Sequence, residues 1–191
     1  MEYKSNAKDY LNRLSVLIQT FDLTLYSKMV ETILDSYRRQ AQIFVMGNGG
    51  SGATASHLVC DINKGCCFDL SKKFKMICLN DNTPTILALA NDVSYAAVFE
   101  EQLKKFLNPE DLVIGISGSG NSKNVLRAID YAARRNARTL GWCGFGGGQL
   151  ARMVDLAFVV QSSDMQQVED AHMIVAHMLM QSLYQALHQE Q

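Results

Sequence analysis

Val45-Met-Gly-Asn-Gly-Gly-Ser-Gly-Ala-Thr-Ala-Ser-His57 is an apolar run that enters a loop of glycine and serine and then opens a helix-like segment. The pattern returns later in the chain as Val113-Ile-Gly-Ile-Ser-Gly-Ser-Gly-Asn-Ser122. Small residues let the backbone approach an anion, while the unpaired N–H groups and the dipole at a helix start favour negative charge. Two such loops predict a site that grips a phosphate group.

The first loop alone also fits a dinucleotide-binding sequence, because Gly47, Gly49 and Gly52 have the spacing G-x-G-x-x-G. Asp81 is available to that alternative as the acid at the end of the second strand. The second loop adds hydroxyl donors that a dinucleotide loop does not need, on Ser117, Ser119 and Ser122. These serines favour a compact phosphomonoester as the ligand.

Whole-chain properties are those of an ordinary globular domain. The 191 residues, 48% hydrophobic and 19% charged, predict one domain over residues 1–191 with a sizeable core. A net charge of −1 gives no general attraction to nucleic acid or to an anionic membrane, so we expect neither as a partner. The five cysteines form no C-x-x-C pair, and the chain shows no secretion signal and no membrane-spanning run, which predicts a reducing, cytoplasmic location.

Apolar spacing predicts helices over residues 3–20 and 23–40, followed by an α/β fold. Their apolar surface exceeds what one small sheet needs, so we expect this N-terminal pair to contact another subunit. Short apolar runs that alternate with helix-like segments predict a parallel sheet covered on both faces, with ligands at the carboxyl ends of its strands. The runs are residues 43–46, 74–79, 112–116, 139–143 and 156–160.

Four motifs in this order resemble a known family: Gly47-Asn-Gly-Gly-Ser51 followed by His57, Ala90-Asn-Asp92, Gly115-Ile-Ser-Gly-Ser-Gly-Asn-Ser122, and a late helix ending in His177. Together they resemble the sugar isomerase (SIS) domain, and closely its phosphoheptose isomerases, over nearly the whole chain. The resemblance implies a five-stranded parallel sheet of flavodoxin-like type and a homotetramer with shared active sites. It also implies conversion of sedoheptulose 7-phosphate to D-glycero-D-manno-heptose 7-phosphate.

Substrate contacts carried over from this resemblance are Asn48, Gly49, Gly50, Ser51, Asn82, Ser117, Gly118, Ser119 and Ser122. Hydroxyls and helix-start amides suit the three acceptor oxygens of a phosphomonoester. Two assignments keep a plain structural alternative: Ser122 as a helix N-cap, and Asn82 as a turn residue at a strand end. Gly118 stands where the family usually has threonine, which predicts a roomier or less polar pocket.

The resemblance also implies one zinc ion held by His57, Asp61, Glu169 and His177. Asp61 replaces the usual glutamate and Glu169 the usual glutamine. His57 and Asp61 are four apart, so they share a helix face within about 40°. Glu169 and His177 are about 80° out of line, whereas His172 is only about 60° from Glu169, so spacing alone does not choose His177. We follow the resemblance and expect His172 to face outward or toward another subunit.

Aldose–ketose isomerisation needs a base at carbon and an acid near oxygen. The resemblance assigns Asp61 as the base and His177 as the acid or proton shuttle. Asp61 is shorter than the usual glutamate and Glu169 is an acid where glutamine is usual, so the two changes can compensate each other. We interpret them as the mark of a subfamily that acts on its own sugar phosphate. The alternative is a non-catalytic SIS tetramer that binds a protein such as a replication initiator, but such relatives tend to lose these side chains, which this chain retains.

Overall fold

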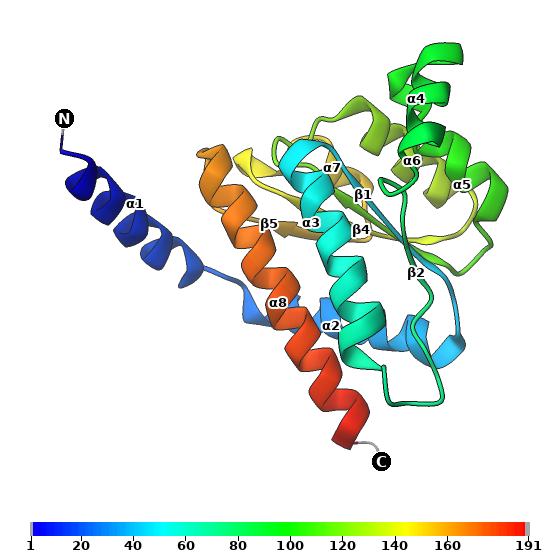
Figure 1. The fold of residues 1–191 in the computed structure, drawn as a ribbon, viewed down its shortest axis with the longest axis horizontal. Helices are drawn as coiled ribbons and strands as arrows, with labels where there is room; N and C mark the ends of the chain where they lie inside the picture. The colour runs from blue at the N-terminus through cyan, green and yellow to red at the C-terminus, as the bar shows by residue number, and fades with distance from the viewer. Residues whose placement is uncertain (1, 190–191) are drawn as a thin grey trace.

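A computed structural model describes residues 2–189 as a five-stranded sheet between two layers of helices (Figure 1). The strands are β1 (Ile43–Gly47), β2 (Met76–Cys78), β3 (Leu112–Ile116), β4 (Arg138–Cys143) and β5 (Leu156–Val159). The α-helices are α1 (Tyr3–Ile18), α2 (Leu23–Arg39), α3 (Gly49–Cys60), α4 (Thr83–Asp92), α5 (Glu100–Phe106), α6 (Lys123–Arg134), α7 (Leu150–Met153) and α8 (Met165–Gln189). Short turns are the π-helical η1 (Asp61–Cys66) and the 3₁₀ turns η2 (Tyr95–Ala97) and η3 (Phe145–Gly147).

The sheet is parallel throughout, and its strand order is β2-β1-β3-β4-β5. This is the flavodoxin-like order, so the expected fold is confirmed. β1 and β3 are neighbours over their full length, from the pair Ile43 and Leu112 to the pair Gly47 and Ile116. The two glycine-serine loops therefore leave the sheet side by side at its carboxyl edge, where ligands bind in such folds.

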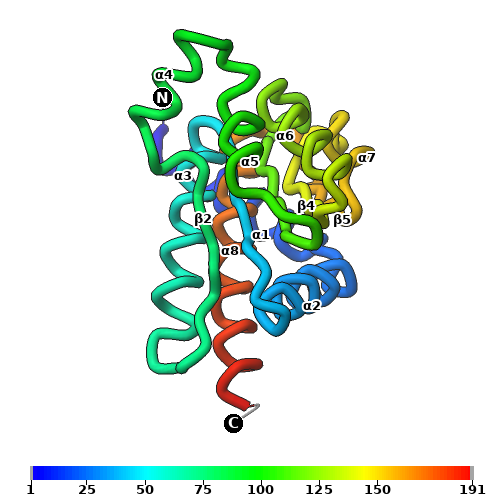
Figure 2. Tube along the Cα trace, turned by 90° about the vertical axis from the view of Figure 1, so that its right-hand side faces the viewer, coloured from blue at the N-terminus to red at the C-terminus, as the bar shows by residue number. Residues whose placement is uncertain are grey.

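Both faces of the sheet are buried, as the uninterrupted apolar strands require. Ile43 and Val45 belong to one core, and Phe44 and Met46 belong to the other. The first core is covered by residues of α2, α3 and α8, and the second by residues of α5, α6 and α7. Figures 1 and 2 both place α3 and α8 side by side, which brings their facing side chains together.

The N-terminal helix α1 extends away from the sheet in Figure 1. Tyr10 holds its middle to the start of α8, because the phenol donates a hydrogen bond of 2.5 Å to Asp170. Leu11 and Val16 remain 64% and 69% exposed. The predicted helical pair is thus confirmed, and α1 presents apolar side chains that the described residues leave uncovered.

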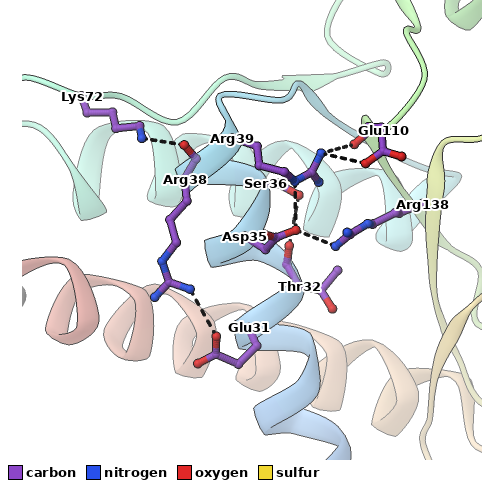
Figure 3. A network of polar contacts seen from close by, with 9 residues as sticks. All are labelled: Glu31, Thr32, Asp35, Ser36, Arg38, Arg39, Lys72, Glu110 and Arg138. Carbon is purple, nitrogen blue, oxygen red and sulfur yellow. Dashed lines mark hydrogen bonds and ion pairs between the residues drawn. The ribbon is translucent and has the colours of Figure 1, made fainter.

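Helix α2 is tied to the amino edge of the sheet by a polar network, drawn in Figure 3. Asp35 accepts hydrogen bonds from Arg138 at 2.6 Å and from Arg39 at 3.0 Å. Arg39 also contacts Glu110 at 3.4 Å. Exposed ion pairs each contribute about 0–1 kcal/mol, so this network mainly orients α2 at the edge opposite the two loops.

Several element boundaries differ from the sequence prediction by one or two residues, and the end of the late helix differs by more. The second strand covers only Met76–Cys78 instead of residues 74–79. The late helix does not end in His177, because α8 continues to Gln189 and packs Leu179, Leu183 and Leu187 into the core. Among residues 2–189, no helix combines the length and the apolar character needed to cross a bilayer.

Candidate active site

The starts of α3 and α6 enclose a pocket of about 250 Å³ at the carboxyl edge of the sheet. Most of the predicted substrate contacts meet there, since both loops leave neighbouring strands. The pocket is lined by Asn48, Gly49, Gly50, Ser51, Ser117, Gly118, Ser119, Ser122, Met165 and Glu169. Eight of these ten residues come from the two loops and two come from the first turns of α8.

A pair of side-chain amides joins the two loops below this pocket. Asn48 donates a hydrogen bond to Asn124, and Asn124 donates one back to Asn48, both 2.9 Å long. Tyr95 also donates to the Asn48 carbonyl oxygen at 2.7 Å. The side chain of Asn48 therefore does not cap α3, although it occupies the N-cap position, and it fixes the relative positions of the two helix starts.

Ser122 occupies the N-cap position of α6, yet its hydroxyl makes no capping hydrogen bond. Its oxygen instead lies 2.9 Å from that of Ser117. Ser117 is nearly buried and Ser119 accepts a bond from the Asn121 amide at 3.2 Å. Ser122 is thus at the predicted N-cap position but does not cap α6 through its side chain. The hydroxyls of Ser117 and Ser122 can both turn toward a ligand in the pocket.

His57, Asp61 and His177 form a second cluster on the facing sides of α3, η1 and α8. The His57 Nε2 atom lies 2.9 Å from His177 Nε2 and 3.1 Å from Asp61 Oδ2. The predicted sharing of one helix face by His57 and Asp61 is confirmed. It holds although Asp61 begins the π-helical turn that follows α3.

This cluster fits a divalent metal ion. One nitrogen or oxygen atom from each of the three residues lies within 4.8 Å of the others. Neutral imidazole nitrogens and carboxylate oxygens are the usual donors to zinc.

Glu169 lies apart from these three donors, at the glycine loop. Its carboxylate is directed at Gly50, where the three nearest neighbours of an added methyl group would all be atoms of Glu169. Eight residues separate Glu169 from His177, which is about 12 Å along a helix axis. Among the described residues the structure groups three of the four predicted metal ligands and puts Glu169 in the serine-lined pocket. Its role as a fourth ligand stays a prediction.

A larger cavity, of about 940 Å³, lies at the opposite edge of the sheet. It is bordered by α2 residues such as Lys28 and by the beginnings of β4 and β5 at Arg138 and Leu156. Parallel α/β sheets bind ligands at the carboxyl ends of the strands, where the two serine-containing loops are found. We therefore assign the active site to the smaller pocket.

The chain is similar to known proteins over most of its length. A family model described as the SIS domain matches residues 2–144, and the phosphoheptose isomerase of Helicobacter pylori strain P12 is 34% identical over 81% of this chain and 80% of its own. The chain belongs to the SIS-domain family, in its phosphoheptose isomerase group. A probable phosphoheptose isomerase of Thermoplasma volcanium is 32% identical over 90% of this chain and 87% of its own.

Solved structures agree in fold. A phosphoheptose isomerase from Francisella tularensis has a TM-score of 0.90 at 21% identity, covering 97% of this chain and 100% of that one. The enzyme from Neisseria gonorrhoeae has a TM-score of 0.87 at 23% identity, covering 96% and 98%. The arrangement of strands and helices in this SIS-domain protein is thus the same as in those two.

The structure corrects expectations about two individual residues of this SIS-domain protein. Gly118 does not make the pocket roomier, because Met165 fills the space: a methyl group at position 118 would lie 2.5 Å from its sulfur. The thioether of Met165 agrees with the other alternative, a less polar pocket. His172 does not face outward; it is fully buried against Trp142, with ring centroids 5.9 Å apart. Burial lowers the pKa of His172 to about 4. The helix phase of α8 turns this residue into the core.

Asn82 has a structural task in the SIS fold. It is the N-cap of α4, and its side chain accepts a hydrogen bond of 3.1 Å from the Thr85 amide. Asn82 is therefore a turn residue that follows a strand, as one alternative predicted. A contact between Asn82 and a substrate stays a prediction. Sequence reasoning missed Asn124 and Tyr95, whose bonds to Asn48 order the site; the available signal was an asparagine two positions after Ser122, the end of the second serine loop.

Proposed function

We propose that this protein is a phosphoheptose isomerase that interconverts sedoheptulose 7-phosphate and D-glycero-D-manno-heptose 7-phosphate. The carrying observation is that α3 begins in the serine-lined pocket and carries an acid/base cluster at its other end. Ser51 belongs to the serine-lined pocket, and His57 and Asp61 belong to the histidine cluster. A ligand that spans both must be anionic at one end and reactive at the other.

The spacing of these two centres suits an extended sugar chain. Six residues separate Ser51 from His57, about 9 Å along the axis of α3. Carbon–carbon bonds of ~1.5 Å give a zigzag chain of seven carbons roughly 8 Å in length. A heptulose with its phosphate among the serines therefore brings its first two carbons to the histidine cluster.

The phosphate end is held by hydroxyl and backbone donors. Ser51, Ser117, Ser119 and Ser122 supply hydroxyls, and the starts of α3 and α6 supply N–H groups and the favourable end of each helix dipole. Such donors are directional and match the three oxygens of a phosphomonoester. Asn48 and its partner Asn124 keep the two sets of donors at a fixed separation.

Proton transfer falls to Asp61 and His177. Asp61 takes the proton from the carbon next to the carbonyl, which yields an enediol, and His177 exchanges the proton on oxygen. Return of a proton to the neighbouring carbon completes the exchange of aldose and ketose. His57, 3.1 Å from Asp61 and 2.9 Å from His177, orients both groups.

Zinc is part of the proposal. His57, Asp61 and His177 would hold the ion, whereas Glu169 as a fourth ligand stays a prediction, because its carboxylate lies at Gly50. When bound, the ion supplies Lewis-acid polarisation of the sugar oxygens. The acid/base assignments of Asp61 and His177 rest on their shared cluster with His57 and are tested separately from metal content.

The chain is further proposed to act as one SIS domain in a cytoplasmic homotetramer. Leu11 and Val16 on α1, with Leu23 at the start of α2, are each more than 60% exposed. Apolar side chains gathered on a projecting helix favour burial against another copy. Multi-angle light scattering should give four times the 21.2 kDa chain mass, and a fully active species of 21.2 kDa would contradict the tetramer.

The isomerase assignment is tested by kinetics with sedoheptulose 7-phosphate. Asp61→Asn and His177→Gln should each lower kcat by about 10²–10⁴-fold while the melting temperature stays near that of the wild type. Asp69→Asn and His188→Gln are matched controls, because these two residues pair with each other at 3.2 Å elsewhere on the surface. Full activity in Asp61→Asn or His177→Gln would refute the assigned roles.

A further inference from the structure

The phosphate pocket contains a carboxylate of the protein itself. Glu169 reaches from the first turns of α8 across to α3, where its carboxylate lies directly against Gly50. Gly50 stands in the first turn of α3, beside the unpaired N–H groups of that helix start. The carboxylate therefore lies close to the positive end of the α3 helix dipole, which would otherwise act only on a bound anion.

No positive side chain balances this carboxylate within the pocket. Among the ten residues that line it, Glu169 is the one with a charge, and the others are glycine, serine, asparagine and methionine. A phosphate dianion that enters a space of about 250 Å³ must approach Glu169 closely. Like charges at such a distance repel strongly, because little solvent separates them.

We propose that Glu169 is a specificity-determining residue that makes the pocket select phosphate esters of polyhydroxy chains over free phosphate. Free phosphate meets repulsion from the carboxylate and can offset it only with a P–OH group of its own. A sugar phosphate carries several hydroxyl groups next to its phosphate, and these donate hydrogen bonds that an ionised carboxylate accepts. The hydroxyls of the chain offset the repulsion for the ester to a degree that free phosphate does not match, which sets the two apart.

Gly50 provides the space that the Glu169 carboxylate needs. A methyl group at that position would collide with both carboxylate oxygens of Glu169, and these are among its three nearest neighbours. The missing side chain at Gly50 is thus what lets Glu169 reach the loop. Because this inference rests on the sugar-phosphate binding proposed above, its test uses equilibrium binding and not turnover.

The experiment is isothermal titration of the full-length protein with inorganic phosphate and, separately, with sedoheptulose 7-phosphate. Wild type is compared with Glu169→Gln, which keeps the shape and removes the charge. Glu101→Gln is the matched control, because it changes the net charge by the same amount. Glu101 pairs with Lys104 on the outer surface of α5. Each titration is repeated after treatment with a chelator, so that altered metal content cannot produce the result.

We expect Glu169→Gln to bind inorganic phosphate about tenfold more tightly and to lose about tenfold or more of its preference for the sugar phosphate. Glu101→Gln should match the wild type in both. An unchanged phosphate Kd and an unchanged preference in Glu169→Gln would overturn the inference. If wild type fails to bind sedoheptulose 7-phosphate, the proposed function fails, while the phosphate titrations still measure the effect of the charge. Should Glu169→Gln fold poorly, Glu169→Ala serves as the second uncharged variant, with the same expectation for free phosphate.

Discussion

The side chains of Asn48 and Asn124 exchange two hydrogen bonds of 2.9 Å across the starts of α3 and α6. Asn124 is 2% exposed and also accepts a bond from the Val125 amide at 3.0 Å. Both halves of the phosphate pocket therefore depend on one buried amide. The two glycine-serine loops act as a unit because this pair fixes them.

Removing that amide should weaken the fold and the site together. Asn124→Ala leaves the Val125 N–H and the Asn48 amide short of partners, so we expect a loss of about 1–3 kcal/mol in the free energy of unfolding. Urea denaturation measures it. Asn91→Ala is the control, since Asn91 is exposed and its side chain bonds to the adjacent Asp92, away from the pocket. Equal free energies of unfolding for Asn124→Ala and Asn91→Ala would show that the amide pair of Asn48 and Asn124 does not stabilise the fold.

Ser122→Ala separates ligand binding from helix capping. Because the Ser122 hydroxyl caps nothing and faces Ser117, its loss should change the melting temperature little yet weaken sugar-phosphate binding by about 1–3 kcal/mol. Asp22→Ala should behave in the opposite way. Asp22 accepts a capping bond of 2.9 Å from Leu25 far from the pocket, and losing such a cap costs about 1 kcal/mol of stability. A Ser122→Ala protein that melts early but binds normally would restore the N-cap interpretation.

Two glycines in the loops should respond differently to alanine. At Gly50 the obstructing atoms are the mobile end of Glu169, so Gly50→Ala should cost less than about 1 kcal/mol as the carboxylate turns away. At Gly120 the backbone has φ +66°, and a methyl group would collide with the backbone of Gly147. Gly120→Ala should therefore destabilise by more than about 2 kcal/mol, a difference that thermal and urea unfolding can rank. Equal stability of the two variants would refute this account of the loops.

Acid should destabilise the protein through His172. Burial holds its pKa at about 4 in the folded protein, below the ordinary 6.5, because the charged ring would lose its hydration in the core. Between pH 6.5 and pH 4 this histidine is protonated in the unfolded chain but not in the folded protein. The free energy of unfolding is therefore highest above pH 6.5 and falls as the pH drops toward 4. The expected loss between about pH 7 and pH 5 is about 2 kcal/mol.

His172→Leu checks the source of that acid sensitivity. The apolar replacement keeps the core filled next to Trp142 and has nothing to titrate. The free energy of unfolding of His172→Leu should therefore fall by less than that of the wild type between pH 7 and pH 5. The difference between the two losses should be about 2 kcal/mol, the amount assigned to the histidine. The same pH dependence in both proteins would assign the effect to other groups.

The amino-acid sequence alone determined the sheet, the two anion-binding loops and the family. Strands β1 and β3 are short apolar runs that end in glycine and serine, and local patterns of this kind fix both the strand and the helix start that follows it. The four-residue spacing of His57 and Asp61 likewise sets their shared face through the helix repeat alone.

Only the tertiary structure decided where the side chains of α8 and of the loop ends point. Three residues on α8 lie within a few turns, yet Glu169 enters the phosphate pocket, His172 enters the core beside Trp142, and His177 meets His57. The rotation of a long helix against its neighbours depends on packing along its whole length, which no local spacing encodes. Asn124 was missed for the same reason, because its partner Asn48 is distant in sequence and reaches it only through the pairing of β1 with β3.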